Sequence, residues 1–247
     1  SVRSSPVSDT TVVSAIEPSV LSVQPHQAAP VGLAWSGGKD SALALQALRR
    51  DGVEVSALLT TITEGYDRVS MHGVRRELVR RQAAATGVPL VEVTIPPDCV
   101  NSVYEERMAA AFAGSPLDEI GAMASGDLFL EDVRAYREQR LVGAGKEALF
   151  PLWGRDTEAL AREFVNEGFE AVVCCLDPRK LDASFAGRPY DADFLVDLPD
   201  DVDPCGERGE FHTFVHAGPV LSKPVSIAVG DVVERCGFVF CDLVARD

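Results

Sequence analysis

Short apolar runs alternate with longer segments of helical periodicity over the first half of the chain. Strands are expected in the runs at residues 31–35, 53–61 and 90–95, and a fourth is expected to end near residue 125. Helices are expected in the amphipathic segments 42–49, 71–86 and 100–113. Strand and helix in alternation favour parallel pairing, with helices on both faces of the sheet. The sequence therefore predicts the α/β class.

The second half predicts a smaller α/β domain. Helices are expected at 129–141 and 157–168, the second capped by Asp156 or Thr157, and a buried strand is expected at 171–176. From residue 211 onward, strand-like runs alternate with turns. We place a first domain at 30–125 and a C-terminal substrate domain at 126–247. Residues 1–29 lack the layout of a signal peptide and are expected to form a disordered lead.

Composition narrows the classes of function. A formal net charge of −15 argues against a generic nucleic-acid surface, because phosphate contacts need clustered lysine and arginine. No apolar run approaches the roughly 18 residues that a membrane span needs. The six cysteines show neither a Cys-x-x-Cys pair nor the spacing of a disulfide framework. We therefore expect reduced thiols and a cytoplasmic protein that does not associate with membranes.

The sequence Ser-Gly-Gly-Lys-Asp-Ser at residues 36–41 connects the first predicted strand to the first predicted helix. Gly37 and Gly38 let the backbone approach a bulky anion, and the free N–H groups of the helix N-terminus favour negative charge. Lys39 adds a positive charge, while Ser36 and Ser41 add hydroxyl donors. Asp40 would repel a phosphate unless a cation such as Mg²⁺ lies between them. This loop predicts a nucleotide site at the carboxyl ends of the strands.

Two further polar clusters follow in the second half. Asp127 and Glu131 lie at a predicted strand-to-helix junction, where they either cap the helix or face a bound phosphate through a cation. Within 203–213, Glu210 and His212 would project to one face of a strand, as acid–base or substrate-holding groups. A polar turn before a strand explains the same residues. Cys205, His212 and His216 invite a zinc interpretation, which lacks a fourth ligand.

The loop resembles the PP-loop of ATP pyrophosphatases, which cleave ATP between the α and β phosphates. Together with Gly-Asp-Leu-Phe-Leu-Glu-Asp-Val-Arg at 126–134, Phe-Pro-Leu-Trp at 150–153 and Asp-Pro-Cys-Gly-Glu-Arg-Gly-Glu-Phe-His-Thr at 203–213, it resembles the diphthine–ammonia ligase family. This resemblance implies a Rossmann-like (HUP-type) domain over 30–125 that binds ATP and Mg²⁺. It also implies an amide ligase: a carboxylate is adenylated, ammonia from ammonium attacks, and AMP and pyrophosphate leave.

The resemblance also implies roles for individual residues. The phosphates would be held by Ser36, Gly37, Gly38, Lys39, Asp40 and Ser41, and the adenosine side would be lined by Thr60, Thr61, Met71 and His72. Gly126, Asp127 and Glu131 would lie beside the α-phosphate, with Asp40 and Asp127 as the metal ligands. Catalytic residues would be Lys39 and Asp40, with Glu207, Glu210 and His212 facing the acceptor. The family's acceptor is diphthine on elongation factor 2; in a bacterial chain it would be another carboxylate.

Two other functions share the loop. One is a PP-loop enzyme that modifies RNA or a small molecule, although RNA would require a basic face that this acidic chain lacks. The other is a non-catalytic adenine-nucleotide sensor, which needs no pyrophosphate chemistry. Asp40, Ser41 and the second acidic cluster favour catalysis. A homodimer is possible, and the sequence does not determine the oligomeric state.

Overall fold

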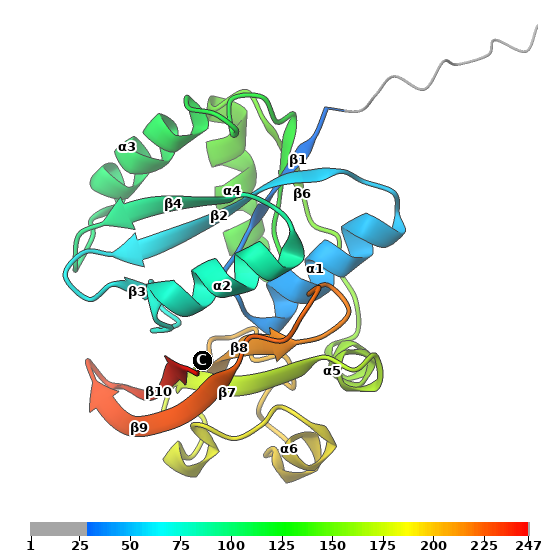
Figure 1. Cartoon of the computed structure of the whole chain (residues 1–247), viewed down its shortest axis with the longest axis vertical. Helices are drawn as coiled ribbons and strands as arrows, with labels where there is room; N and C mark the ends of the chain where they lie inside the picture. Colours follow the sequence, from blue (N-terminus) through cyan, green and yellow to red (C-terminus); the bar gives the residue numbers. More distant parts are fainter. Residues whose placement is uncertain (1–28, 247) are drawn as a thin grey trace, which may run out of the picture.

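The computed structural model describes residues 29–246, so residues 1–28 of the expected lead lie outside the described part. Two sheets are stacked along the long axis of the molecule (Figure 1). In the first sheet, β2 pairs in parallel with β1 and β4, β1 pairs with β5, and β5 pairs with β6. These strands are β1 (Val31–Ala34), β2 (Val55–Thr63), β4 (Leu90–Ile95), β5 (Ala122–Ala124) and β6 (Glu147–Leu149). A two-residue strand, β3 (Arg68–Val69), runs antiparallel to the end of β2. The predicted parallel sheet is thus confirmed.

Helices cover both faces of this sheet, as the strand–helix alternation predicts. Along β2, Leu58 packs into one core cluster with residues of α1 (Lys39–Arg50) and α2 (Arg76–Thr86). Its neighbour Leu59 packs into the other cluster with residues of α3 (Asn101–Phe112) and α4 (Glu131–Gly143). Successive side chains of a strand point to opposite faces, so both faces of β2 are buried.

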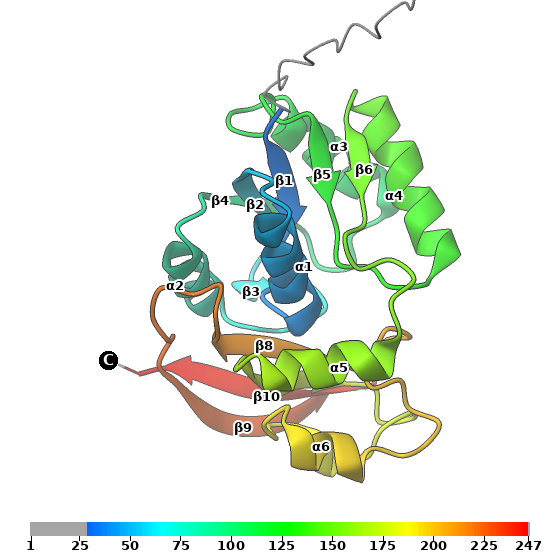
Figure 2. The ribbon, with the colours of Figure 1, turned by 90° about the vertical axis from the view of Figure 1, so that its right-hand side faces the viewer.

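The C-terminal half forms a second, antiparallel sheet in the order β8-β7-β10-β9. Its strands are β7 (Glu170–Leu176), β8 (Phe211–Ala217), β9 (Ile227–Arg235) and β10 (Phe238–Ala245). Figure 2 shows α5 (Thr157–Asn166) and α6 (Ala192–Asp197) alongside this sheet. The Asp156 carboxylate caps α5 by accepting a 2.8 Å hydrogen bond from the Ala159 N–H, as expected. The smaller C-terminal α/β unit is therefore confirmed.

Two details differ from the prediction. The helix expected from residue 71 begins only at Arg76, because Met71 and Gly73 have φ values of 66° and 70° and form a turn. A Cβ on Gly73 would lie 2.5 Å from Phe240 of β10, so the turn is pressed against the second sheet. The first sheet also continues through β6, past the expected boundary at residue 125. The position of a domain boundary stays a prediction.

A fully buried glutamine joins the two sheets at the glycine loop. The Gln82 Oε1 atom accepts a 2.8 Å hydrogen bond from the Trp35 indole. Its Nε2 group donates to the carbonyl of Gly37 at 2.9 Å and to that of Val215 at 2.6 Å. The Val215 N–H donates in turn to the Gly37 carbonyl at 2.9 Å. One side chain of α2 thus fixes the loop against β8.

We predict that Gln82→Ala lowers the free energy of unfolding by about 2–3 kcal/mol, because it leaves a buried indole N–H and backbone carbonyls without full partners. Chemical denaturation measures this loss. Gln139→Ala is the matched control, since Gln139 lies on the exposed face of α4 and should change stability by less than about 0.5 kcal/mol. Equal losses in the two variants would contradict the joining role of Gln82.

Candidate functional site

The glycine loop has the geometry of an anion cradle. It runs from the end of β1 to Gly38, the N-cap of α1, so the positive end of that helix lies at the carboxyl edge of the sheet, and the Lys39 N–H donates to the Thr213 hydroxyl at 3.1 Å. Gly37 has φ +81°, and a Cβ there would lie 2.7 Å from the Gln82 amide oxygen. The Ser36 hydroxyl accepts from the Gly38 N–H at 3.2 Å, and the Ser41 hydroxyl donates to the Gly38 carbonyl at 2.8 Å. The loop therefore needs a glycine at position 37. The hydroxyls of Ser36 and Ser41 stabilise its conformation through their hydrogen bonds to the Gly38 backbone.

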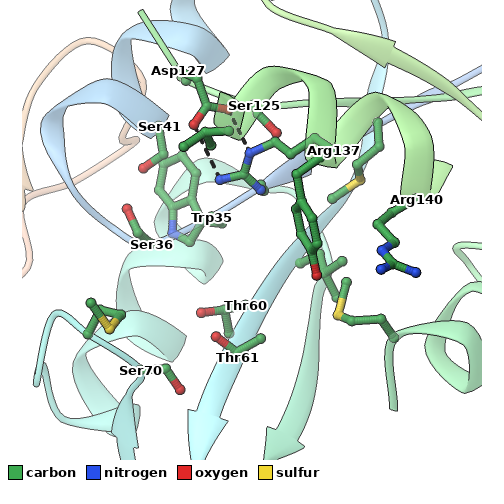
Figure 3. A pocket seen from close by; sticks show the side chains of 18 of the residues that line it. Trp35, Ser36, Ser41, Thr60, Thr61, Ser70, Ser125, Asp127, Arg137 and Arg140 are labelled. Atoms are coloured by element: carbon green, nitrogen blue, oxygen red, sulfur yellow. Dashed lines mark hydrogen bonds and ion pairs between the residues drawn. The ribbon is translucent and has the colours of Figure 1, made fainter. Parts of the chain in front are cut away.

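A cavity of about 950 Å³ opens beside this loop, at the carboxyl ends of β1, β2 and β5. Strand β1 continues through α1 to β2 on one side, while β5 pairs on its other side, so the cavity lies at the switch point of the sheet. Figure 3 shows Ser36, Ser41, Thr60, Thr61 and Ser70 around one part of it. The predicted site residues that line the cavity are Ser36, Asp40, Ser41, Thr60, Thr61, Met71, His72, Gly126, Asp127, Glu207 and His212.

Five predicted residues are not among those that line the cavity: Gly37, Gly38, Lys39, Glu131 and Glu210. The glycines form the body of the loop behind its lining atoms. Glu131 is exposed on the first turn of α4. Glu210 is buried, where one carboxylate oxygen lies 3.4 Å from the Asp203 N–H and the other has no partner in the described chain.

Lys39 is buried and paired within the protein. Its ammonium donates to both oxygens of Asp40, at 2.9 and 2.8 Å, and to the Cys205 carbonyl. Burial lowers the pKa of Lys39, but the Asp40 carboxylate more than compensates, so the pKa lies above its ordinary value. Burial also raises the pKa of Asp40, against the effect of Lys39. Lys39 thus keeps its positive charge directly behind the loop, where the Asp40 carboxylate balances it.

Asp127 and Glu207 bring two more carboxylates to the same end of the cavity. Asp127 forms an ion pair with Arg137 at 2.7 Å, and α4 begins after Leu130 with no side-chain cap. The alternative that Asp127 caps this helix is therefore wrong. The Glu207 carboxylate accepts from the Leu128 N–H at 2.7 Å. Burial, with the nearby Asp40 and Asp127 carboxylates, raises the pKa of Glu207 to about 7.

Two imidazole rings lie together at the cavity wall. The ring centroids of His72 and His212 are 4.4 Å apart. Burial and the neighbouring Lys39 charge lower the pKa of His212 to about 4, and burial holds the pKa of His72 well below its usual range. Both rings are therefore neutral at pH 7. The Nδ1 atom of His72 is buried and has no hydrogen-bond partner within the described residues.

Sequence reasoning missed a large part of the lining. Trp35 and Ser125 follow β1 and β5 directly, so their position at strand ends was a usable signal. The contributions of α3 and α4 had no such signal, because neither helix shows a strong apolar stripe. These residues are Tyr104, Glu105, Met108, Ala109 and Phe112 of α3 and Val133, Tyr136, Arg137, Arg140, Leu141 and Gly143 of α4.

The described residues contain no group of three or more His, Cys, Asp or Glu side chains arranged to hold a metal ion. Cys205, His212 and His216 therefore do not form the zinc site considered from the sequence. Among the helices of the described chain, none is both long and apolar enough to cross a bilayer.

The fold and the cavity define a class: Rossmann-like α/β proteins with a PP-loop at the switch point of a parallel sheet. Comparison of sequences places the chain within that class. The family model of the diphthamide synthase N-terminal domain matches residues 30–142, and that of the diphthamide synthase C-terminal domain matches residues 156–241. The chain belongs to the diphthamide synthase family, which confirms the resemblance drawn from its motifs.

Curated relatives carry one name, diphthine–ammonia ligase. The Schizosaccharomyces pombe protein is 24% identical over 230 residues, a match that covers 85% of this chain and 38% of the yeast protein. The Bos taurus protein is 23% identical over 227 residues, covering 83% of this chain and 85% of the relative. The Rattus norvegicus protein is 24% identical over 231 residues, with coverage of 83% and 85%. The match thus spans well under half of the yeast protein and most of the mammalian ones.

We predict that Glu207 makes the protein less stable as pH rises. The pKa of Glu207 is about 7 in the folded chain, against an ordinary value of 4.5. Its stabilising contribution is present below pH 4.5 and is lost as pH rises to about 7, because the unfolded chain releases this proton first. Glu207→Gln keeps an oxygen for the Leu128 N–H and removes the titration.

Denaturation of the wild type and Glu207→Gln across this pH range isolates the effect. The wild type should lose about 1–2 kcal/mol relative to the variant, a figure reduced for solvent screening. Glu106→Gln, on the exposed face of α3, is the matched control and should follow the wild type. Parallel curves for the wild type and Glu207→Gln would refute the raised pKa.

Proposed function

We propose that this protein is an ATP-dependent amide ligase that forms AMP and pyrophosphate and joins ammonia to a carboxylate. The observation that carries the proposal is the loop of residues 36–41, which joins β1 to the N-terminus of α1 and lines a large cavity at the sheet's switch point with Ser36, Asp40 and Ser41. The names of the curated relatives support the same reaction. The acceptor would be diphthine on elongation factor 2 in an archaeal or eukaryotic chain, and another carboxylate in a bacterial one.

The chemistry proceeds in two balanced steps. An oxygen of the acceptor carboxylate attacks the α-phosphorus of ATP, and the bond from that phosphorus to the bridging oxygen breaks, so pyrophosphate leaves. The nitrogen of ammonia then attacks the acyl carbon, the bond from carbon to the AMP oxygen breaks, and the nitrogen loses one proton. Activation is needed because a carboxylate at neutral pH resists direct attack by ammonia.

The loop would stabilise the departing pyrophosphate. The Ser36 hydroxyl would donate to a phosphate oxygen while it accepts from the Gly38 N–H, the positive end of the α1 dipole would favour the anion, and the buried ammonium of Lys39 would add positive charge behind the loop. Thr60, Thr61 and Met71 line the side of the cavity where the adenosine would lie. Gly126 fits closely behind the loop, since a Cβ there would lie 2.8 Å from the Asp40 backbone.

The donor set at the loop fits Mg²⁺ carried by the nucleotide. Mg²⁺ is commonly held by one or two protein carboxylates together with substrate phosphates and water. Asp40 and Asp127 are the carboxylates in position, both at the cavity wall. When bound, the ion would neutralise charge that develops on the phosphate oxygens. These two side chains would also orient the phosphates relative to the loop.

The His72–His212 pair and Glu207 would serve the nitrogen side. Neutral imidazoles accept hydrogen bonds, so they can hold the N–H groups of ammonia while its lone pair faces the acyl carbon. Glu207, whose pKa is about 7, can take up a proton that ammonium releases. Glu210 lies outside the lining residues and would support the 203–211 turn. A cytoplasmic location and a homodimer stay predictions.

Product analysis tests this proposal. ATP labelled at the α and γ phosphates is incubated with Mg²⁺, ammonium and pools of carboxylates, and the labelled products are separated. We expect AMP and pyrophosphate, formed at least about 100-fold more slowly by Asp40→Asn, because one of the two carboxylates that would hold the Mg²⁺ ion is lost. Asp200→Asn, an exposed position far along the chain, is the matched control and should retain activity.

Other products would decide against the ligase. ADP and phosphate would refute cleavage between the α and β phosphates. Tight ATP binding without turnover in every pool would favour the sensor. AMP formed only with RNA in the pool would favour a modifying enzyme of the same class.

A further inference from the structure

The cavity continues beyond the loop into a recess between two helices, which we call the α3–α4 arm. Its walls are Tyr104, Met108 and Phe112 of α3 and Tyr136, Arg137 and Arg140 of α4. Figure 3 shows Arg140 across the cavity from Ser36 and Ser70, with Arg137 between them beside Asp127. The proposed roles of the loop, the magnesium ligands and the histidines leave this arm without an occupant.

The inner part of the arm is apolar. Tyr104, Met108 and Phe112 pack against a buried cluster that includes Leu59 and Met123, and both of these also line the cavity. Burial raises the pKa of Tyr104, so its hydroxyl is neutral at pH 7. A surface of this kind favours an apolar or aromatic body and disfavours a second triphosphate.

One charged group lies where the arm meets the phosphate loop. The Arg137 guanidinium pairs with Asp127 at 2.7 Å, and the adjoining Gly126 is in contact with the Asp40 backbone. A second nitrogen of Arg137 donates to Asp127 at 3.3 Å, which leaves three of the five guanidinium N–H donors unused by this carboxylate, and the side chain, 37% exposed, lines the cavity. Arg140 lies farther out, paired with Glu105 at 2.5 Å and stacked on Tyr136.

We infer that the α3–α4 arm binds the acceptor, a carboxylate carried on an apolar or aromatic body, and that Arg137 holds this carboxylate beside the phosphate loop. The inference rests on the proposed ligase function for the role of the occupant. A carboxylate that approaches the α-phosphate meets strong repulsion, and a guanidinium between the two anions lowers it. Apolar contacts in the arm select the body, while Arg137 orients the reacting oxygen.

The chain carries reporters for both parts of the cavity. It has three methionines, and all of them line the cavity: Met108 and Met123 at the arm, and Met71 at the turn before α2. Protein with labelled methionine methyl groups therefore gives three NMR signals, which Met→Leu variants assign. The probes are phenylbutyrate, its neutral amide phenylbutyramide, and ATP with Mg²⁺.

We expect phenylbutyrate to shift the Met108 and Met123 signals saturably and to bind about tenfold more tightly than the amide, because only the acid forms a charge-assisted pair. ATP should shift Met71 and still permit phenylbutyrate to bind. Arg137→Gln should reduce the affinity for the acid to that for the amide. Arg137→Lys keeps the charge opposite Asp127 and should give an intermediate loss, even if the glutamine variant is unstable.

Arg107→Gln is the matched control, because Arg107 lies on α3, is exposed and does not line the cavity. A peptide that carries a side-chain carboxylate is then tested as a competitor of phenylbutyrate, to distinguish a protein-borne acceptor from a free acid. Displacement of phenylbutyrate by the peptide or by a free acid supports the site. Equal binding of acid and amide, or ATP shifting Met108 and Met123 while displacing phenylbutyrate, would overturn the inference. The NMR titration needs no turnover of ATP. If the product analysis gave ADP, the ligase function would be refuted, but binding of phenylbutyrate at the arm would still have been measured.

Discussion

The contact between the Gly37 carbonyl and the second sheet determines how the phosphate loop is built. That carbonyl accepts hydrogen bonds from the Gln82 amide and from the Val215 N–H, while the Lys39 N–H donates to the Thr213 hydroxyl at 3.1 Å. A glycine loop that only followed β1 would be free to sample many conformations, since glycine carries the largest backbone entropy. Here α2 and β8 hold it from behind, so the C-terminal half is a structural part of the loop's conformation. This arrangement favours unfolding of the two halves of the chain together over unfolding of either half alone.

The same packing sets the electrostatics of the cavity. Lys39 is removed from water, and its charge is retained because Asp40 and the Cys205 carbonyl face it at close range. A buried charge that lost these partners would neutralise, because burial penalises the charged form. The charge of Lys39 in turn disfavours protonation of His212. Burial and the Lys39 charge together keep this imidazole neutral, the state in which it accepts hydrogen bonds.

Much of the fold and part of the candidate site could be predicted from the sequence, because the patterns that indicate them lie within short segments. The loop at 36–41, the four predicted strands of the parallel sheet and the Asp156 cap each depend on neighbouring residues, and the structure confirms those elements, whereas β6 was not predicted. The start of α2 could not be predicted, because Phe240 presses on Gly73 across the two sheets. The position of Lys39 depends on the carbonyl of Cys205, far along the chain. Arg137 was missed for a related reason: its partner Asp127 precedes the helix, and its place at the cavity depends on α3 beside it.

The cavity's two parts also differ in how their charges are balanced, which bears on what each can bind. Near the loop, Asp40, Asp127 and Glu207 face Lys39 and Arg137, so this end carries excess negative charge until a cation or a proton enters. Burial, with the Asp40 and Asp127 carboxylates nearby, raises the pKa of Glu207 to about 7. At the arm, Arg140 is matched by Glu105, and the remaining walls are apolar. Polyanions therefore need an accompanying cation at one end, while a single carboxylate on an apolar body can be satisfied by Arg137 at the junction. This difference in charge favours a polyanion with its cation at the loop end and a single carboxylate at the arm.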